Sequence, residues 1–311
     1  MNRARFLIVG ASGFVGSHLY AALGREHSIA TYNSRPMPGG VHFDATTMSL
    51  SDTILRDARG VTHAFLLHGM NNIDECARKP ELAHKINVDG QKRIIDDLLA
   101  AGVVPVFASS DAVFDGTRGM WTEEDPVNPV LTYGRHKAQV EQYLQEKSRP
   151  WLAVRLAKVV GVTPGTENLL SVWMNQLEKG DAIRCAHDQV FSPVDVDDVI
   201  RALIRLVEDG VTGIFHICGP RPVTRLEFLR LVEDEVRKYR SVSSKITSCS
   251  IRDFDFAEKR PLNTSMSPRK VYAALGGSFG ELSGVCVRAA AARYADPASS
   301  RAGIRPSSAQ R

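Results

Sequence analysis

The sequence has few cysteines and no pattern that would organise them around a metal. Five occur in 311 residues, and no two form a C-x-x-C pair. Scattered thiols in odd number are typical of reduced cysteines in a cytoplasmic protein and argue against a zinc cage. His63 and His68 flank an apolar stretch with no carboxylate at metal-ligand spacing. We therefore predict that backbone groups, rather than a metal, satisfy these rings, and we expect no metal site.

The sequence also lacks a long apolar run and a strong charge of one sign. No stretch approaches the roughly 18 apolar residues that a membrane span requires. The opening MNRARFLIVG breaks at a glycine with no cleavage site after it, which indicates a buried strand rather than a signal peptide. From Val287 onward five arginines stand against one aspartate, a difference equal to the whole net charge of +4. The remaining chain is close to neutral, so neither nucleic acid nor a membrane is an expected partner.

Short apolar runs alternate with helical patterns along most of the chain. Hydrophobic residues make up 43% and charged residues 24%, as in ordinary globular proteins. This alternation predicts βαβ units, hence an α/β fold with a doubly wound parallel sheet. The predicted strands span residues 5–9, 28–32, 62–67, 103–108, 151–156 and 213–218, and the predicted helices span residues 14–24, 80–101, 133–147 and 196–208.

Three glycines stand between the first strand and the first helix, in FLIVGASGFVGSHL. Glycine permits a tight turn, lets a pyrophosphate approach the backbone, and lets strand and helix pack closely. The start of the helix then offers free N–H groups and a positive dipole end to phosphates. This context predicts a Rossmann dinucleotide site. The predicted cofactor contacts in this loop are Gly10, Ser12, Gly13, Phe14, Val15 and Gly16.

An acidic residue is missing where the second strand ends. An acid at this point would bond the ribose 2′-hydroxyl of NAD and repel the extra phosphate of NADP. In SIATYNSRP the strand is followed by Asn33, Ser34 and Arg35. A guanidinium beside a hydroxyl and an amide suits a 2′-phosphate. We therefore predict that NADP(H) is preferred, with NAD(H) as the alternative.

The alternation of strands and helices divides the chain into two regions and a tail. Residues 1–160, completed by residues 191–219, form the predicted NAD(P)-binding Rossmann domain. Residues 161–190 and 220–294 lie outside the regular alternation and form the predicted substrate-binding lobe. Residues 295–311 are rich in Ala, Ser, Pro and Arg with no apolar period, so we expect a disordered tail.

Two segments carry a candidate catalytic set. VFASSDAVFDG ends a predicted strand at Ser110, and TYGRHK opens a predicted helix with Tyr133 and Lys137 four residues apart. Residues four apart lie on one helix face, and an ammonium beside a phenol lowers the pKa of the tyrosine. A tyrosine so placed is a general acid, and the serine hydroxyl can bond a carbonyl undergoing reduction.

These motifs resemble those of a known family. The G-x-x-G-x-x-G spacing is similar to that of the extended short-chain dehydrogenase/reductases. SSDAVFDG, TEEDPVNP and YGRHK, followed in order by FSPVDVDDV, GIFHICG and KRPLNTSMSPRK, resemble the motif series of the dTDP-4-dehydrorhamnose reductase family of nucleotide-sugar reductases. INVDG also matches. The resemblance covers roughly residues 5–275, and VFDG and RPLNTS point to the rhamnose-reductase branch.

The resemblance implies roles for particular residues. Ser110, Tyr133 and Lys137 would be catalytic, the last two also contacting the cofactor. Asn87 and Asp44 would lie at the cofactor pocket. The residues implied at the substrate are Asp111, Val113, Asn168, Arg260 and Asn263, with Thr264 beside them. The sequence departs from the family pattern in two places. Ala112 stands where the family usually has tyrosine, and the chain after about Gly276 no longer resembles the family.

The expected function is NADPH-dependent reduction of a nucleotide-linked 4-keto-6-deoxy sugar by an oxidoreductase. Two alternatives stay open. One is a nucleotide-sugar epimerase or dehydratase of the same family, and the other is a non-catalytic NADP-binding regulatory subunit. The expected partners are a nucleotide-sugar substrate and a second copy of the chain in a homodimer.

Overall fold

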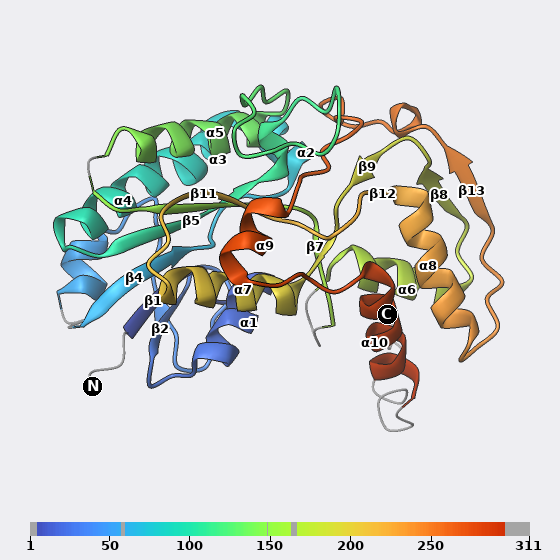
Figure 1. Cartoon of the computed structure of the whole chain (residues 1–311), viewed down its shortest axis with the longest axis horizontal. Helices are drawn as coiled ribbons and strands as arrows, with labels where there is room; N and C mark the ends of the chain where they lie inside the picture. Colours follow the sequence, from blue (N-terminus) through green and yellow to red (C-terminus); the bar gives the residue numbers. More distant parts are fainter. Residues whose placement is uncertain (1–4, 57–59, 148, 163–166, 296–311) are drawn as a thin grey trace, which may run out of the picture.

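The core of the protein is a seven-stranded parallel sheet (Figure 1). The computed structural model describes residues 5–56, 60–147, 149–162 and 167–295, so the predicted disordered tail lies outside the described residues apart from Ala295. Every pair of neighbouring strands is parallel. In spatial order the strands are β3 (Val41–His42), β2 (Ser28–Tyr32), β1 (Arg5–Val9), β4 (Val61–Leu66), β5 (Val104–Ser110), β6 (Leu152–Leu156) and β11 (Gly213–Ile217).

Helices cover both faces of this sheet, as a parallel sheet requires. On one face α1 (Phe14–Leu23) and α7 (Val196–Glu208) contact each other and bury Leu19 and Leu203 against the strands. On the other face α4 (Gly90–Ala100) and α5 (Thr132–Gln145) bury Ile94 and Val140 in a separate apolar cluster. This arrangement confirms the predicted doubly wound α/β fold.

The longest predicted helix, over residues 80–101, is interrupted. It consists of α3 (Pro80–His84), a π-helical turn at Lys85–Asp89, and α4. A further helix, α2 (Ile73–Arg78), precedes it and was not predicted. The π turn carries the buried Asn87, whose side chain holds the chain after β4. Such turns often occur at functional sites, and apolar periodicity does not reveal them.

A second apolar core lies beside the carboxyl edge of the sheet, at the right of Figure 1. It is built by α6 (Leu169–Lys179), α8 (Arg225–Arg237) and α10 (Leu282–Tyr294). Trp173 stands edge-on against Phe228 at its centre, with ring centroids 5.0 Å apart. Short strand pairs flank it: β7 (Val159–Val160) with β10 (Val194–Asp195), β8 (Ile183–Ala186) with β13 (Ile246–Cys249), and β9 (Val190–Phe191) with β12 (Val223–Thr224). The assignment of this region to substrate binding stays a prediction.

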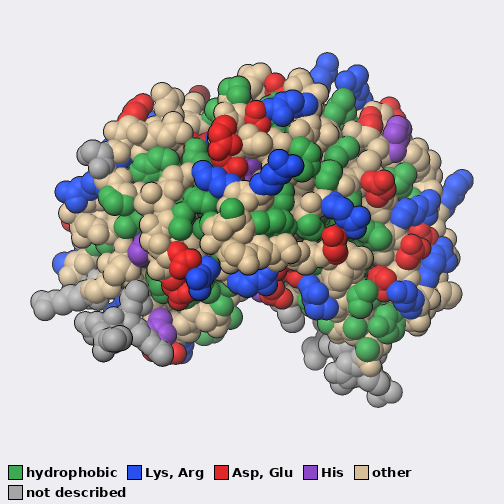
Figure 2. Space-filling view, in the orientation of Figure 1, with side chains coloured by type: hydrophobic (Ala, Val, Ile, Leu, Met, Phe, Trp, Pro, Cys, Tyr) green, Lys and Arg blue, Asp and Glu red, His purple; other side chains and the backbone are tan. Residues whose placement is uncertain are grey.

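The visible surface carries mixed charge. On the face shown in Figure 2, Lys and Arg side chains are interspersed with Asp and Glu. Within the described residues, no helix is long and apolar enough to cross a membrane. Within the same residues, no group of three or more His, Cys, Asp and Glu side chains is placed to hold a metal ion.

A buried polar network links the sheet to α5. The Arg155 guanidinium on β6 pairs with the Glu141 carboxylate on α5, with 2.7 Å between Nη2 and Oε2, and each side chain is only 3% exposed. Ser109 on β5 donates a hydrogen bond to the same carboxylate. On the far side Arg155 Nη1 lies 3.2 Å from Nε2 of His216, whose Nδ1 lies 3.2 Å from the Trp121 carbonyl oxygen. Since arginine can only donate, Nε2 accepts and His216 is a neutral ring protonated at Nδ1.

This network predicts a loss of stability at mildly acidic pH. Burial and the neighbouring Arg155 charge lower the pKa of His216 from 6.5 to about 3. Below pH 6.5 the histidine therefore binds a proton in the unfolded chain but not in the folded chain. Its contribution to the free energy of unfolding is fully present above pH 6.5 and is lost progressively toward pH 3. We expect the free energy of unfolding to decline by about 1.4 kcal/mol per pH unit for this histidine. Urea unfolding at pH 7.5 and 5.5 measures the decline, and equal values at both pH values would contradict it.

Candidate active site

The glycine loop has the geometry that a dinucleotide requires. Gly10 has a φ of 92°, which favours glycine, and a Cβ on Gly16 would lie 2.4 Å from the Gly10 carbonyl oxygen. Both residues must therefore be glycine for α1 to start against β1. Gly13 occupies the N-cap of α1, and no side chain caps the helix. The first N–H groups of α1 are consequently available to an anion. Ser12, Phe14 and Val15 are partly buried along the same loop.

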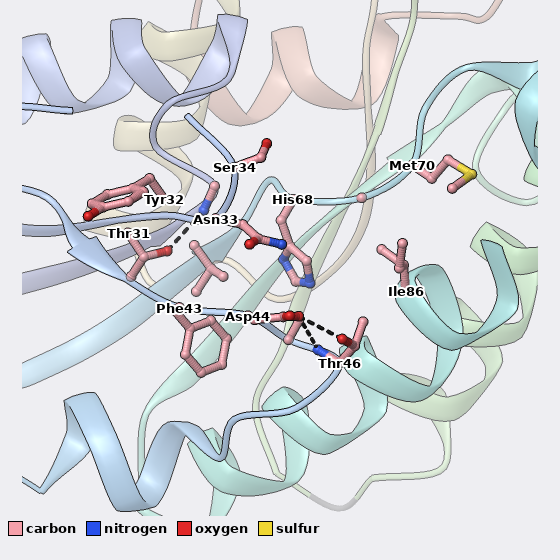
Figure 3. A pocket seen from close by; sticks show the side chains of 14 residues that line it. Thr31, Tyr32, Asn33, Ser34, Phe43, Asp44, Thr46, His68, Met70 and Ile86 are labelled. Carbon is pink, nitrogen blue, oxygen red and sulfur yellow. Dashed lines mark hydrogen bonds between the residues drawn. The ribbon is translucent and has the colours of Figure 1, made fainter. Parts of the chain in front are cut away.

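A pocket opens beside this loop, between the ends of β1, β2 and β4 (Figure 3). Asn33, Ser34 and Asp44 belong to its wall, as predicted for cofactor contacts. The Asp44 carboxylate accepts hydrogen bonds from the Thr46 backbone at 2.8 Å and hydroxyl at 2.7 Å. These bonds lower the pKa of Asp44 and fix its orientation. The further residues that line the pocket are Val9, Gly10, Thr31, Tyr32, Phe43, Ala45, Thr46, His68, Gly69, Met70 and Ile86.

Arg35 and Asn87, which were predicted to contact the cofactor beside this pocket, do not line its wall. Arg35 is exposed just beyond it. Asn87 is 2% exposed, and its amide bonds the Met70 backbone twice, each time at 2.8 Å. Its side chain is therefore committed to shaping the Gly69–Met70 segment, which does line the pocket.

Among the described residues, neither His63 nor His68 has the backbone partner that was predicted for its ring. His63 Nδ1 lies 3.0 Å from the Thr62 hydroxyl oxygen, so this ring has a side-chain partner. His68 has none, because both of its buried ring nitrogens lack a hydrogen-bond partner. The prediction is therefore wrong for His68, whose ring has no hydrogen-bond partner among the described residues.

Ser110 and Asp111 form a small hydrogen-bonded unit at the carboxyl end of β5. The Ser110 hydroxyl donates to the Asp111 carboxylate at 2.9 Å, and the Thr264 hydroxyl donates to the other carboxylate oxygen at 2.9 Å. Burial raises the pKa of Asp111, and these two bonds oppose that rise. Thr264 comes from the C-terminal part of the chain, so the unit joins both regions of the protein.

Tyr133 and Lys137 lie next to this unit. The Lys137 ammonium donates to the Ala108 carbonyl oxygen at 2.6 Å and lies 5.5 Å from the centroid of the Tyr133 ring. The Ser110 hydroxyl is a hydrogen-bond partner of Tyr133. The three residues predicted to be catalytic are thus brought together at one edge of the sheet.

The direction predicted for the tyrosine pKa is wrong in this structure. Burial raises the pKa of Tyr133, the negative charge of Asp111 raises it further, and only the hydrogen bond with Ser110 lowers it. Burial also lowers the pKa of Lys137 from 10.5 to about 8. Desolvation therefore outweighs the attraction between ammonium and phenolate that the spacing suggested. Tyr133 is held as the neutral phenol, which is the proton-donating form.

Two contacts fix the start of α5. A Cβ on Gly134 would lie 2.0 Å from the Ala112 carbonyl oxygen, so only glycine lets the helix approach the turn that follows Ser110. The Glu258 carboxylate accepts hydrogen bonds from the Thr132 backbone at 3.0 Å and hydroxyl at 2.8 Å. An acid at a helix N-terminus is favourable because the helix dipole is positive there. Both contacts set the position of Tyr133.

The remaining predicted substrate residues have other partners. Val113 is fully buried in the core, so its side chain cannot meet a substrate, and that prediction is wrong. Asn168 caps α6 and donates to the Gly161 carbonyl oxygen at 2.9 Å. Asn263 accepts from the Ser265 hydroxyl at 2.7 Å, and Arg260 pairs with Asp74 at 2.7 Å. These three polar side chains shape the loops around the cleft.

The sequence reasoning missed two cations, Lys158 near Asp111 and Arg225 near Lys158. Lys158 follows β6, whose Leu156 is paired with Ser110, and it is exposed. Arg225 begins α8, with its guanidinium 5.4 Å from the centroid of the buried Trp173 ring. Lys158 lies within electrostatic range of Asp111 and Arg225, and neither cation has a carboxylate partner among the described residues. A lysine just past a strand end at the carboxyl edge was the available signal.

The sheet order, the glycine loop and the clustered Ser110, Tyr133 and Lys137 define a nucleotide-binding α/β protein of the short-chain dehydrogenase/reductase type. The chain belongs to the RmlD substrate binding domain family, whose family model matches residues 4–282. This membership confirms the predicted family and the class of NAD(P)-dependent oxidoreductases.

Two curated relatives illustrate the range of the family. The chain is 24% identical over 285 residues to the dTDP-4-dehydrorhamnose reductase of Aggregatibacter actinomycetemcomitans, covering 88% of this chain and 94% of the relative. It is 25% identical over 285 residues to methionine adenosyltransferase 2 subunit beta of Rattus norvegicus, covering 86% and 81% respectively. A sugar-nucleotide reductase and a protein named as a subunit are therefore about equally similar.

Solved structures share the fold. The dTDP-4-dehydrorhamnose reductase of Bacillus anthracis in complex with NADP matches with a TM-score of 0.80 at 21% identity. The match covers 92% of this chain and 98% of the reductase chain. The dTDP-glucose 4,6-dehydratase DesIV of Streptomyces venezuelae, with NAD and TYD bound, has a TM-score of 0.76 at 20% identity and covers 93% and 96%.

Proposed function

We propose that the protein reduces the keto group of a nucleotide-linked 4-keto-6-deoxy sugar, using a nicotinamide cofactor bound in the pocket beside the glycine loop. The observation that carries the proposal is the meeting of Ser110, Tyr133 and Lys137 next to that pocket. The named function of the Aggregatibacter relative supports the substrate class.

The residues of the loop and pocket fit such a cofactor. Gly10 and Gly16 leave no room for a Cβ, so the backbone stays open to a pyrophosphate at the uncapped start of α1. The unpartnered nitrogens of His68 border the same pocket. When bound, the nicotinamide group supplies the hydride.

Side chains of the protein would then orient the carbonyl and donate the proton. On substrate binding the Ser110 hydroxyl, which donates to Asp111 in this structure, would donate to the carbonyl oxygen instead and so orient it. Tyr133, held neutral by burial, transfers its phenolic proton to that oxygen as the carbon is reduced, leaving an alcohol. Lys137, whose ammonium lies 5.5 Å from the centroid of the Tyr133 ring, would stabilise the resulting phenolate through its positive charge.

The test of this mechanism is a Tyr133→Phe variant assayed with a panel of nucleotide 4-keto sugars. We expect the wild type to oxidise NADPH with one of them, and the variant to be slower by roughly 10²-fold because the proton donor is lost. Cofactor affinity should stay within about twofold, since the ring remains. Turnover at the wild-type rate in the variant would rule out the assigned proton donor. Absence of turnover in the wild type with every sugar would favour a role as a non-catalytic subunit, because relatives named as a subunit are about equally similar to this chain.

The substrate's nucleotide diphosphate explains the unpaired cations Lys158 and Arg225. Two neighbouring positive charges repel each other, and an anion that binds both removes that repulsion. A diphosphate is such an anion, and arginine bonds phosphate oxygens in pairs. We infer that the two side chains bind the diphosphate while the sugar reaches Ser110.

This inference predicts a defect in binding rather than in chemistry. Lys158→Ala and Arg225→Ala should each raise KM for the nucleotide sugar about tenfold, with kcat changed less than about threefold, because the diphosphate is held equally in ground and transition states. Lys179→Ala, an exposed lysine at the end of α6, is the matched control and should leave KM unchanged. An unchanged KM in both cleft variants would refute the assignment.

We further propose that NADPH is preferred over NADH, because Asn33 and Ser34 replace an acid at the end of β2 and Arg35 stands close by. Fluorescence titration of the wild type should give a lower Kd for NADPH than for NADH. Arg35→Ala should reduce the difference by about tenfold to a hundredfold, the effect of one charge-assisted contact. Arg205→Ala, an exposed arginine on α7, serves as the control. Equal wild-type Kd values for the two cofactors would contradict the preference.

A further inference from the structure

His68 has two buried ring nitrogens and no hydrogen-bond partner for either among the described residues. It follows β4 at the carboxyl edge of the sheet, and both Nδ1 and Nε2 are shielded from solvent without a hydrogen-bond partner. A neutral imidazole always carries one donor and one acceptor. Burial lowers the pKa of His68 from 6.5 to about 3, so the ring is neutral and both capacities are unused. Buried polar groups without partners are rare and often mark functional positions.

The position of His68 links it to the pocket. A Cβ on Gly10 would lie 2.8 Å from the His68 backbone nitrogen, so the residue packs directly on the glycine loop. The side chain belongs to the pocket wall, and Figure 3 shows the ring reaching toward the space between Asn33 and Asp44. The charge of Lys137 acts on the ring from the other side. His68 thus lies between the glycine loop and the candidate catalytic residues.

The backbone of His68 is held in place. Its carbonyl oxygen accepts a hydrogen bond from the Gln91 amide nitrogen at 3.0 Å, and the Gln91 carbonyl oxygen is itself buried without a partner. The ring therefore has a fixed attachment point and an unused donor at the edge of a pocket. Such an arrangement suits ligand binding, because a side chain that is already fixed loses little conformational entropy when it binds.

We propose that His68 is a cofactor-binding residue whose ring N–H donates a hydrogen bond to an oxygen of the ribose–phosphate part of a dinucleotide in this pocket. The proposal rests on the proposed function only in that a nicotinamide dinucleotide is the occupant. It does not depend on which sugar, if any, is reduced.

The test compares two substitutions of His68 by their Kd for NADPH, measured by fluorescence titration without any sugar. His68→Leu keeps an apolar side chain of similar size and removes the donor, so we expect about tenfold weaker binding. His68→Asn keeps an N–H donor and should retain most of the affinity. The melting temperature of the cofactor-free His68→Leu protein should equal or exceed that of the wild type, because the ring makes no hydrogen bond to lose.

A matched control is His63→Leu on β4, the strand that precedes His68. The His63 ring has its own partner in Thr62 and lies outside the pocket wall, so the Kd of this variant should be that of the wild type. His68→Leu with wild-type Kd would overturn the proposal. Equal weakening in His68→Leu and His68→Asn together with a lower melting temperature would also overturn it, in favour of a packing role. Absence of turnover in a wild type that binds NADPH would reject the proposed function and leave this inference standing.

Discussion

The structure depends on one buried ion pair, between Arg155 on β6 and Glu141 on α5. Removing either partner would leave an uncompensated charge in the core at a cost of about 3–5 kcal/mol. The pair fixes α5 against the strand that ends at Ser110, since Ser109 bonds the same carboxylate. Glu141 also lies one helical turn after Lys137, and its charge raises the pKa of that lysine against the lowering effect of burial. One carboxylate thus positions the catalytic helix and helps to keep its lysine protonated.

The polar groups near the site fall into two kinds. Asn87 and Asn168 use both ends of their amides on backbone groups and so determine the shape of the loops. Lys158, Arg225 and His68, by contrast, form no ion pair or hydrogen bond with another side chain among the described residues. Polar groups that already have protein partners shape the site, and polar groups without such partners face its ligands. A buried donor or charge without a partner is unfavourable in free energy until a ligand binds it. The proposals for substrate and cofactor binding follow from this distinction.

Local patterns in the sequence predicted much of the fold. The strands at Arg5–Val9 and Ser28–Tyr32 and the helix at Val196–Glu208 have the predicted bounds, because apolar runs and caps mark them directly. The glycine loop and the spacing of Tyr133 and Lys137 were likewise local signals. The predictions that failed concern tertiary contacts. The pKa of Tyr133, the burial of Val113 and the isolation of His68 depend on what other segments place around them, and one sequence does not give that information.

The central claim is net hydride transfer to the sugar, and isotope transfer tests it most directly. The protein would be incubated with a nucleotide 4-keto sugar and NADPH carrying deuterium at the transferred position of the nicotinamide ring. Our account predicts one deuterium on the former keto carbon of the product for each NADPH oxidised, with the proton on oxygen drawn from solvent through Tyr133. An epimerised or dehydrated sugar without net oxidation of NADPH would contradict the account, as would a sugar recovered unchanged.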